Sequence, residues 1–337
     1  MAIRVGINGF GRIGRLVLRF ILERKLENLN VVAVNDLTDS KTLAHLFKYD
    51  SIHGQYSGEV VADDNSIFID GECFRVFSES DPRNLPWCKL ACDVVIESTG
   101  IFRKRGQAAQ HLNAGAKKVI ISAPAEGDVD ATVVLGVNDH ILTGEEQVIS
   151  NASCTTNCLA LMVKVLDDAF GLEKGFMTNI HAYTAEQNIQ DAPHRDLRLA
   201  RAAAVSIVPK VTESAKAVGL VLPHLQGKLD GLSLRVPVPD GALLDFTAVL
   251  GREVTVEEVT NAFKAAAEQA LAGILQYTEE PLVSVDIIHN PHSCIFDALS
   301  TSVNGNLVKV MGWYDNEWGY SARVAELIEK VMEKVVT

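Results

Sequence analysis

The chain has 337 residues, of which 47% are hydrophobic and 22% are charged, and its formal net charge is −12. This length exceeds the usual size of one hydrophobic core, so two domains are expected. The acidic balance argues against nucleic-acid binding, which needs basic surface. No apolar run approaches the length of a membrane span, and the six cysteines lack the spacing of a disulfide framework. We therefore expect a cytoplasmic protein with free thiols, no membrane partner and no signal peptide.

The N-terminal stretch predicts a nucleotide site. Apolar residues at 3–7 and 31–34 predict two short strands, and a helical pattern lies between them. The first turn reads Gly-x-Gly-x-x-Gly, which lets the backbone turn tightly and approach a pyrophosphate at the start of the helix. The predicted binding residues in this turn are Gly9, Gly11, Arg12, Ile13 and Gly14. Asp36 follows the second strand, where its carboxylate can accept both ribose hydroxyls and would repel a 2′-phosphate, so NAD is favoured over NADP.

Further strands are predicted in the first half, and helical patterns lie between several of them. The strands cover 66–69, 73–77, 93–97, 118–122 and 132–137, and the helices cover 42–49 and 106–114. Two of these strands lead into the small residues Ser98, Thr99 and Ser122. Small residues at strand ends are where an open α/β sheet meets its ligand. The first half is therefore predicted to be a doubly wound Rossmann-type domain.

The segment Ser-Asn-Ala-Ser-Cys-Thr-Thr-Asn-Cys at 150–158 lies between a predicted strand and a predicted helix over 159–170. Asn151 or Ser153 is expected to be the N-cap of this helix, which places Cys154 at its first turn. A helix N-terminus favours an anion, so we expect the Cys154 thiol to ionise easily and act as a nucleophile. Cys158 should be buried. No metal site is expected, because no second Cys/His cluster lies at ligand spacing.

A nucleophilic cysteine needs a base, and His181 follows a predicted strand over 176–180. Later in the chain, 255–271 is predicted to be a helix that begins with a capping box of Thr255 and Glu258. Strands are predicted over 282–288 and 307–313, and a last helix over 321–336.

The cysteine segment resembles the active-site signature of the phosphorylating glyceraldehyde-3-phosphate dehydrogenases. The resemblance runs over nearly the whole chain, from the glycine turn at 6–14 to Trp-Tyr-Asp-Asn-Glu-Trp-Gly-Tyr at 313–320. It implies an NAD-binding domain at 1–153, completed by a C-terminal helix at 317–337. It also implies an α+β catalytic domain at 154–316 with a mostly antiparallel sheet, assembly into a homotetramer, and a role in glycolysis.

The resemblance also implies a reaction and the residues that perform it. Glyceraldehyde 3-phosphate would be oxidised through a cysteine thioester that inorganic phosphate attacks to give 1,3-bisphosphoglycerate. Catalysis would rest on Cys154 and His181. Asn316 would hold the nicotinamide carboxamide, and Ser98, Thr99 and Ser122 would surround the cofactor. Thr184 and Arg235 would bind the substrate phosphate, whereas Ser153, Thr155 and Thr212 would bind the attacking phosphate.

Several positions depart from the family pattern. Leu199 stands where a second arginine is usual, and Glu213 replaces a glycine of the phosphate loop. Each change should weaken anion binding by about 1–3 kcal/mol if the residue lines the site. Either inorganic phosphate is therefore bound poorly, or Lys210 compensates in part. Glu186 replaces an aspartate, which is a milder change. The string Asp191-Ala192-Pro193 also departs from the pattern. NAD-preferring members often end it in Leu-Pro and NADP-using members often in Ala-Ser, and this chain has one residue of each kind, which leaves some NADP use open.

Two alternatives stay open at the level of sequence. One is a non-phosphorylating dehydrogenase of a related aldehyde such as erythrose 4-phosphate, because those enzymes also alter the phosphate loop. The other is a weakly active paralogue with a sensing role. The intact set of Cys154, His181 and Asn316 speaks against the second alternative.

Overall fold

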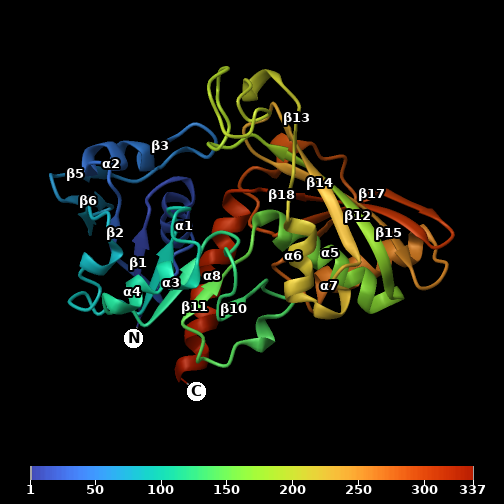
Figure 1. Ribbon diagram of the computed structural model, residues 1–337, viewed down its shortest axis with the longest axis horizontal. Coiled ribbons are helices and arrows are strands. Elements are labelled where there is room, and N and C mark those ends of the chain that lie inside the picture. The colour runs from blue at the N-terminus through green and yellow to red at the C-terminus, as the bar shows by residue number, and fades with distance from the viewer. Residues whose placement is uncertain (1, 337) are drawn as a thin grey trace. The chain divides into compact units, whose positions relative to one another are not determined.

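The computed structural model describes residues 2–336, and the chain forms two compact units (Figure 1). The first unit contains the chain up to Val133, then Asp139–Ala152, and the last segment from Ser321 onward. The second unit contains Val134–Asn138 and Ser153–Tyr320. The chain passes from the first unit to the second between Ala152 and Ser153, immediately before Cys154.

The first unit contains a nine-stranded sheet in the order β10-β11-β9-β8-β1-β2-β7-β6-β5. Its central strands are parallel, and short buried runs of valine and isoleucine form them, as in sheets that are covered on both faces. The strands are β1 (Ile3–Asn8), β2 (Leu29–Asn35), β5 (Val60–Ala62), β6 (Ser66–Ile69), β7 (Glu72–Phe77), β8 (Val94–Glu97), β9 (Lys118–Ile121), β10 (Ala131–Thr132) and β11 (Val148–Ser150), and β3 (Tyr49–Asp50) pairs separately with β4 (Gly54–Gln55).

The helices of this unit are α1 (Arg12–Glu23), α2 (Ser40–Lys48), α3 (Arg105–Ala108) and α4 (Gln110–Asn113), and α8 (Trp318–Val336) lies largely within it. In the sheet, β1 lies between β2 on one side and β8 on the other. The chain first builds outward from β1 through β2, and later returns to add β8 on the opposite side of β1. The strand order therefore reverses beside β1, and an open parallel sheet binds its ligand at such a point, outside the carboxyl ends of the strands.

The second unit contains a seven-stranded sheet in the order β13-β14-β12-β15-β18-β17-β16, with mostly antiparallel neighbours. Its strands are β12 (Leu172–Ala182), β13 (Val208–Lys210), β14 (Leu229–Val236), β15 (Ala242–Leu250), β16 (Leu275–Thr278), β17 (Cys294–Asn304) and β18 (Leu307–Tyr314). The predicted combination of a Rossmann-type unit with an α+β unit is confirmed.

Helices α5 (Cys154–Phe170), α6 (Ser214–Val221) and α7 (Val256–Glu268) pack on one face of this sheet (Figure 1). Helix α5 is buried along most of its length, and α7 begins with the predicted capping box of Thr255 and Glu258. The alternation along β12 assigns its residues to two faces. Asn179 and His181 point toward the helices, whereas Phe176 points outward and is exposed.

Two strand predictions are wrong. Of the predicted strand 132–137 only Thr132 lies in a strand, at the end of β10 (Ala131–Thr132), because the chain then turns: the Val134 N–H donates to Asn138 Oδ1, and Gly136 has a φ of 79°. The predicted strand 282–288 is instead the 3₁₀ helix η5 (Ser284–Ile287). Asp286 accepts a hydrogen bond from the Val283 N–H at its start, and such local side-chain bonds favour a turn over a strand.

The predicted helix over 106–114 is divided into α3 and α4, which meet at Ala109. In the part of the chain that the structure describes, none of the helices combines the length and apolar character that a membrane crossing requires.

Candidate active site

Cys154 is the first residue of α5, and Ser153 is its N-cap. The Ser153 Oγ accepts a hydrogen bond from the Thr156 N–H at 3.0 Å, which satisfies one of the donors that a helix start leaves unpaired. The predicted cap and the predicted position of the thiol are thus both confirmed, with Ser153 rather than Asn151 in the capping role. Cys158, one turn further, is buried as expected, and all six cysteines are free.

The Cys154 Sγ lies 3.6 Å from the Nε2 of His181, near the end of β12. The other ring nitrogen, Nδ1, lies 2.8 Å from the Ala182 carbonyl oxygen and also contacts the Arg235 guanidinium. A carbonyl oxygen can only accept, so Nδ1 must carry the proton that bonds to Ala182. Arg235 Nη1 does not need the Nδ1 lone pair, because it donates to the same carbonyl oxygen at 3.1 Å. This tautomer leaves the lone pair of Nε2 directed at the thiol, which is what a general base requires.

The surroundings of Cys154 oppose the easy ionisation that its position at the helix start suggested. Burial raises the pKa of the thiol, and the positive charge of Arg235 and hydrogen bonds from Thr155 oppose this shift without overcoming it. Burial also lowers the pKa of His181, to about 3, and the charge of Arg235 adds to that effect. The resting pair is therefore a neutral thiol beside a neutral imidazole, so the proton must move to His181 as the sulfur attacks.

A buried hydrogen-bond network fixes the helix against the strand. The Thr155 Oγ1 lies 2.9 Å from the Tyr314 Oη and accepts from Asn179 Nδ2 at 3.0 Å, and the Tyr314 Oη donates to Asn179 Oδ1 at 2.9 Å. The edge of the Tyr314 ring also faces His181, with a centroid separation of 6.0 Å. Sequence reasoning missed Asn179 and Tyr314. The available signal was a polar residue two positions before His181, on the same face of a buried strand.

The predicted substrate-phosphate residues lie beside this pair. Arg235 is on β14 in register with His181, and its guanidinium rests against His181 and Ala182. Its buried Nε makes no hydrogen bond to the described residues. Thr184 follows β12, and its amide N–H lies 3.4 Å from Gln187 Oε1. Arg235 therefore brings both a positive charge and an unsatisfied donor to the face that carries the thiol.

Hydroxyl groups cluster where the attacking phosphate was predicted to bind. The Thr212 Oγ1 donates to the Ser214 Oγ at 3.0 Å, and the Ser214 Oγ lies 3.2 Å from the Ser153 Oγ. Ser214, the first residue of α6, was not singled out from the sequence. The third predicted residue, Thr155, differs from the other two because its hydroxyl is engaged in the buried network with Tyr314 and Asn179.

The two unusual residues do not have the same effect. Leu199 is only 2% exposed, so it is packed as an apolar residue at the position where the resemblance suggested a cation. The Glu213 side chain is 72% exposed and lies 3.5 Å from Lys216. Its negative charge is therefore largely screened by solvent and by a lysine of the same helix turn, which makes it a weaker obstacle to an anion than the sequence suggested.

The glycine turn of the first unit is dictated by close backbone approach. Gly9 has a φ of 91°, and a Cβ there would lie 2.6 Å from the Thr99 nitrogen. A Cβ on Gly14 would lie 2.2 Å from the Gly9 carbonyl oxygen. Among the described residues, no atom lies within 4 Å of a Cβ built on Gly11, which caps α1. Gly9 and Gly14 thus fit the turn itself, whereas Gly11 leaves space at a helix N-terminus, where a pyrophosphate fits.

Asp36 follows β2 and contacts the glycine turn. Its Oδ2 accepts from the Phe10 N–H at 2.8 Å, and its Oδ1 accepts from the Thr38 N–H at 3.0 Å. The carboxylate is thereby held beside the turn, as a ribose ligand should be. The Arg12 guanidinium pairs with Asp50 at 2.6 Å. Burial would raise the pKa of Asp50, but amide hydrogen bonds from His53 and Ile52 and the charge of Arg12 lower it to about 2.

A buried carboxylate holds the strand ends together. Glu97, the last residue of β8, accepts from Asn8 Nδ2 at 2.6 Å and from the Thr99 N–H at 2.9 Å. It also lies 3.0 Å from His111 Nε2, and Trp87 Nε1 donates to the Nδ1 of that ring. The Ser98 Oγ donates to the Gly9 carbonyl at 2.6 Å, and the Ser122 Oγ donates to the Glu97 carbonyl at 3.2 Å. The network around Glu97 was missed from the sequence.

Asn316, in the second unit, has a side chain that is 7% exposed, and its Oδ1 has no hydrogen-bond partner among the described residues. A buried acceptor without a partner is costly unless a ligand satisfies it. The amide group of a nicotinamide carboxamide is a suitable donor. The orphaned oxygen in the second unit and, taken separately, the space above Gly11 in the first unit are both features that NAD would satisfy, so the residues present fit that cofactor.

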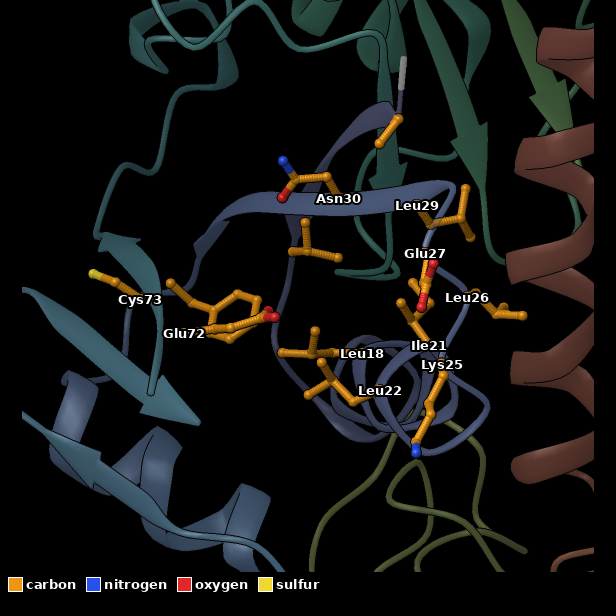
Figure 2. A pocket seen from close by; sticks show the side chains of 13 residues that line it. Leu18, Ile21, Leu22, Lys25, Leu26, Glu27, Leu29, Asn30, Glu72 and Cys73 are labelled. Atoms are coloured by element: carbon orange, nitrogen blue, oxygen red, sulfur yellow. The ribbon is translucent and has the colours of Figure 1, made fainter. Parts of the chain in front are cut away.

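The hollow shown in Figure 2 is separate from all of these residues. Its volume is about 660 Å³, and α1 and the strands β2 and β7 supply much of its lining. Leu18, Leu22, Glu72 and Cys73 are among the side chains that face it. It contains none of the predicted catalytic or cofactor-binding residues.

This geometry defines a class of protein: a nucleotide-binding Rossmann unit joined to a unit that presents a cysteine–histidine pair. The family model described as "Glyceraldehyde 3-phosphate dehydrogenase, NAD binding domain" matches residues 3–105, and the model for the C-terminal domain of the same enzyme matches residues 153–316. The chain is 56% identical to a glyceraldehyde-3-phosphate dehydrogenase of Priestia megaterium over 336 residues, which cover 99% of each chain.

Relatives from other bacteria give the same result. The protein "Glyceraldehyde-3-phosphate dehydrogenase 2" of Streptomyces avermitilis is 56% identical over 329 residues, which cover 97% of this chain and 98% of the relative. The enzyme of Geobacillus stearothermophilus is 56% identical over 99% of both chains. The chain belongs to the glyceraldehyde-3-phosphate dehydrogenase family.

Proposed function

We propose that the protein catalyses the reversible, NAD-dependent oxidation of glyceraldehyde 3-phosphate to 1,3-bisphosphoglycerate, as a step of glycolysis. The observation that carries this proposal is the 3.6 Å separation between Cys154 Sγ and His181 Nε2 at the start of α5. A thiol needs a base at this distance to attack an aldehyde, and the neutral state of His181 leaves its nitrogen free to accept the proton.

Cys154 forms the covalent bond to the substrate, and His181 accepts and returns the protons. The Cys154 thiol gives its proton to His181 Nε2 while the sulfur bonds to the aldehyde carbon, and the proton passes to the new oxyanion to form a hemithioacetal. His181 takes that proton again as the carbon is oxidised to a thioester. The nicotinamide, when bound, accepts the hydride that leaves the carbon. An oxygen of inorganic phosphate then attacks the thioester carbon, and the carbon–sulfur bond breaks. The sulfur leaves as a thiolate that takes back the proton from His181, and the acyl phosphate releases its remaining proton to solvent.

The phosphate groups of the two substrates would be held by different residues. Arg235 and Thr184 would bind the phosphate of the aldehyde, with the unsatisfied Arg235 Nε as one donor. Ser153 and Thr212 would bind the attacking phosphate through the hydroxyl cluster, and Thr155 would support the start of α5 from the buried network. Charge-assisted bonds of this kind contribute about 1.5–3 kcal/mol each.

Different residues would bind different groups of the cofactor. In the first unit the glycine turn would receive the pyrophosphate, Asp36 the ribose hydroxyls, and Ser98, Thr99 and Ser122 the remaining cofactor edge. In the second unit Asn316 would accept a hydrogen bond from the carboxamide. The Asp36 charge, held beside the turn by the Phe10 amide, supports NAD over NADP.

A non-phosphorylating reaction is the second candidate, and the burial of Leu199 is the observation that favours it. The high identity to enzymes named glyceraldehyde-3-phosphate dehydrogenase weighs against it. The two candidates are separated by varying inorganic phosphate at fixed aldehyde and NAD while NADH formation is followed. We expect the rate to depend on phosphate, and a rate that ignores phosphate would overturn the acyl-phosphate step.

We further propose a cytoplasmic homotetramer. Exposed apolar side chains gather on the segment between β12 and α6, where Ile189, Leu197, Val205 and Val211 are each about 80% exposed. Phe176 adds to the apolar surface on the outer face of the sheet. Surfaces of this kind mark protein–protein contacts. Light scattering after size exclusion should give a mass four times that of the 36.6 kDa chain, and a monomer mass would overturn the proposal.

A further inference from the structure

Lys210 lies on the same face of the sheet as the catalytic pair, although it is far from both residues in sequence. In the register of β13 and β14, Lys210 is opposite Ser233 and Val208 is opposite Arg235. Arg235 in turn is opposite His181 on β12. Directly opposed residues share a face, and so do residues two apart on one strand. The side chain of Lys210 therefore emerges on the face that carries Arg235 and His181.

The ammonium group of Lys210 forms an ion pair with Glu186, which follows Thr184 by two residues. The Lys210 side chain is only 22% exposed, so this pair is partly shielded from solvent. Burial would raise the pKa of Glu186, but the hydrogen bond and charge of Lys210, together with the charge of Arg235, lower it. Glu186 is thus a carboxylate at neutral pH, and it holds the lysine in place.

The same two residues depart from the family pattern together with Leu199. The chain places an apolar side chain where the family usually has an arginine, and it places a lysine two residues before the phosphate residue Thr212. Unlike Glu213, which is exposed and paired with Lys216, Lys210 points over the catalytic face. Where the resemblance suggested a cation at 199, the chain instead carries one at 210, two residues before Thr212 of the hydroxyl cluster.

We propose that Lys210 binds inorganic phosphate in the attacking position, and that Glu186 holds the ammonium group until the phosphate displaces it. The proposal rests on the proposed phosphorylating function. It makes Lys210 a determinant of whether phosphate or water resolves the thioester, because a cation two residues from Thr212 raises the local concentration and affinity of the anion. Glu186 competes with phosphate for the same ammonium group, so its removal should strengthen phosphate binding.

The test compares four variants with the parent enzyme, each as the full chain in the assembly that it forms. In Lys210→Met we expect the KM for inorganic phosphate to rise by about ten-fold or more, because a charge-assisted bond is lost. In Glu186→Gln we expect that KM to fall by about three-fold or more, because the competing carboxylate is neutral. Lys117→Met is the matched control, since Lys117 is an exposed lysine of the first unit that pairs with Asp93, and the KM for phosphate should not change.

A second readout does not depend on turnover. The rate at which iodoacetamide alkylates Cys154 is measured with increasing inorganic phosphate, and the concentration that gives half protection should shift in the same directions as the KM. Lys210→Arg should restore most of the loss in both readouts, because it restores the charge. Melting temperatures of all variants, measured alongside, separate a local effect from misfolding.

The outcomes are distinct. An unchanged phosphate KM and unchanged protection in Lys210→Met would overturn the proposal, as would a rise confined to the KM of glyceraldehyde 3-phosphate, which would assign Lys210 to the other phosphate. A parent enzyme whose rate ignores inorganic phosphate would instead overturn the proposed function itself.

Discussion

The two units prepare for their ligands in different ways. In the first unit, the nucleotide edge depends on backbone shape: Gly9 and Gly14 approach neighbouring backbone so closely that a Cβ has no room. In the second unit, the catalytic face depends on side chains that emerge from three strands and the start of a helix. The difference teaches where change is tolerated. A backbone turn accepts one solution, whereas a group of side chains can carry a cation at 210 while an apolar residue is buried at 199.

The largest effect should come from the nucleophile. Replacing Cys154 by serine removes the thiol from the start of α5 and should lower kcat by about 10⁴-fold or more. The measurement is NADH formation under saturating substrates. Cys73→Ser is the matched control, because Cys73 is an exposed cysteine of the first unit and its loss should leave the rate unchanged. Turnover that survives in Cys154→Ser would contradict the covalent route.

The base should matter nearly as much. His181→Asn removes the acceptor that lies 3.6 Å from the thiol, and kcat should fall by about 10²–10⁴-fold, the usual contribution of a positioned base. The alkylation rate of Cys154 in the absence of substrate should fall as well, because the thiol then lacks an acceptor for its proton. An undiminished alkylation rate would show that another group deprotonates Cys154.

The nucleotide edge offers a pair of matched substitutions. Gly14→Ala places a methyl group 2.2 Å from the Gly9 carbonyl, so the backbone must shift, and we expect a loss of about 2–3 kcal/mol in the free energy of unfolding. Gly11→Ala meets open space and should leave that free energy nearly unchanged. It should nevertheless weaken NAD binding, because the added methyl group occupies the proposed pyrophosphate position. Denaturant titration and NAD titration check the two effects separately.

The network behind the site should have a smaller effect. Tyr314→Phe removes a buried hydroxyl that bonds to Thr155 and Asn179, and the free energy of unfolding should fall by about 1–3 kcal/mol. We expect kcat to fall by less than in His181→Asn, since Tyr314 orients the start of α5 and touches the imidazole only by its ring edge. A loss of activity without a loss of stability would give Tyr314 a direct chemical role.

The effect that is smallest at neutral pH is on the pH dependence of stability, because it vanishes above pH 6.5 and grows only as the pH falls. The pKa of His181 is lowered to about 3 in the folded protein, against an ordinary value of about 6.5. The unfolded chain therefore binds an extra proton below pH 6.5, and stability falls between pH 6.5 and about 3, by up to about 1.4 kcal/mol per pH unit from this residue. His181→Asn should remove that slope relative to the parent, as measured by denaturant titration at several pH values. Equal slopes would show that the ring is charged when folded.

Local pattern predicted much of the fold, and its failures have physical causes. Ser66–Ile69 was predicted at its exact bounds because alternation and flanking turns agree there. The segments at 132–137 and 282–288 are just as apolar, but Asn138 and Asp286 bond to nearby amides and turn the chain. Such competition between a side chain and a strand partner depends on tertiary context, which periodicity does not contain.

The candidate site divides in a similar way. The position of Cys154 followed from a cap and a helix pattern, and its partner followed from the chemistry that a thiol needs. The ion pair of Lys210 with Glu186 could not be predicted, because it depends on the register of β13 against β14. The raised pKa of Cys154 was also out of reach, since the degree of burial competes with the helix dipole and only the folded packing decides between them.

The bond between Asp36 and the Phe10 amide has a practical consequence for redesign of coenzyme preference. Deleting the carboxylate to admit a 2′-phosphate would also leave the amide of the glycine turn without its acceptor. Asparagine at this position keeps an acceptor oxygen and removes the charge, so Asp36→Asn is a safer starting point for an NADP-accepting variant than Asp36→Ala.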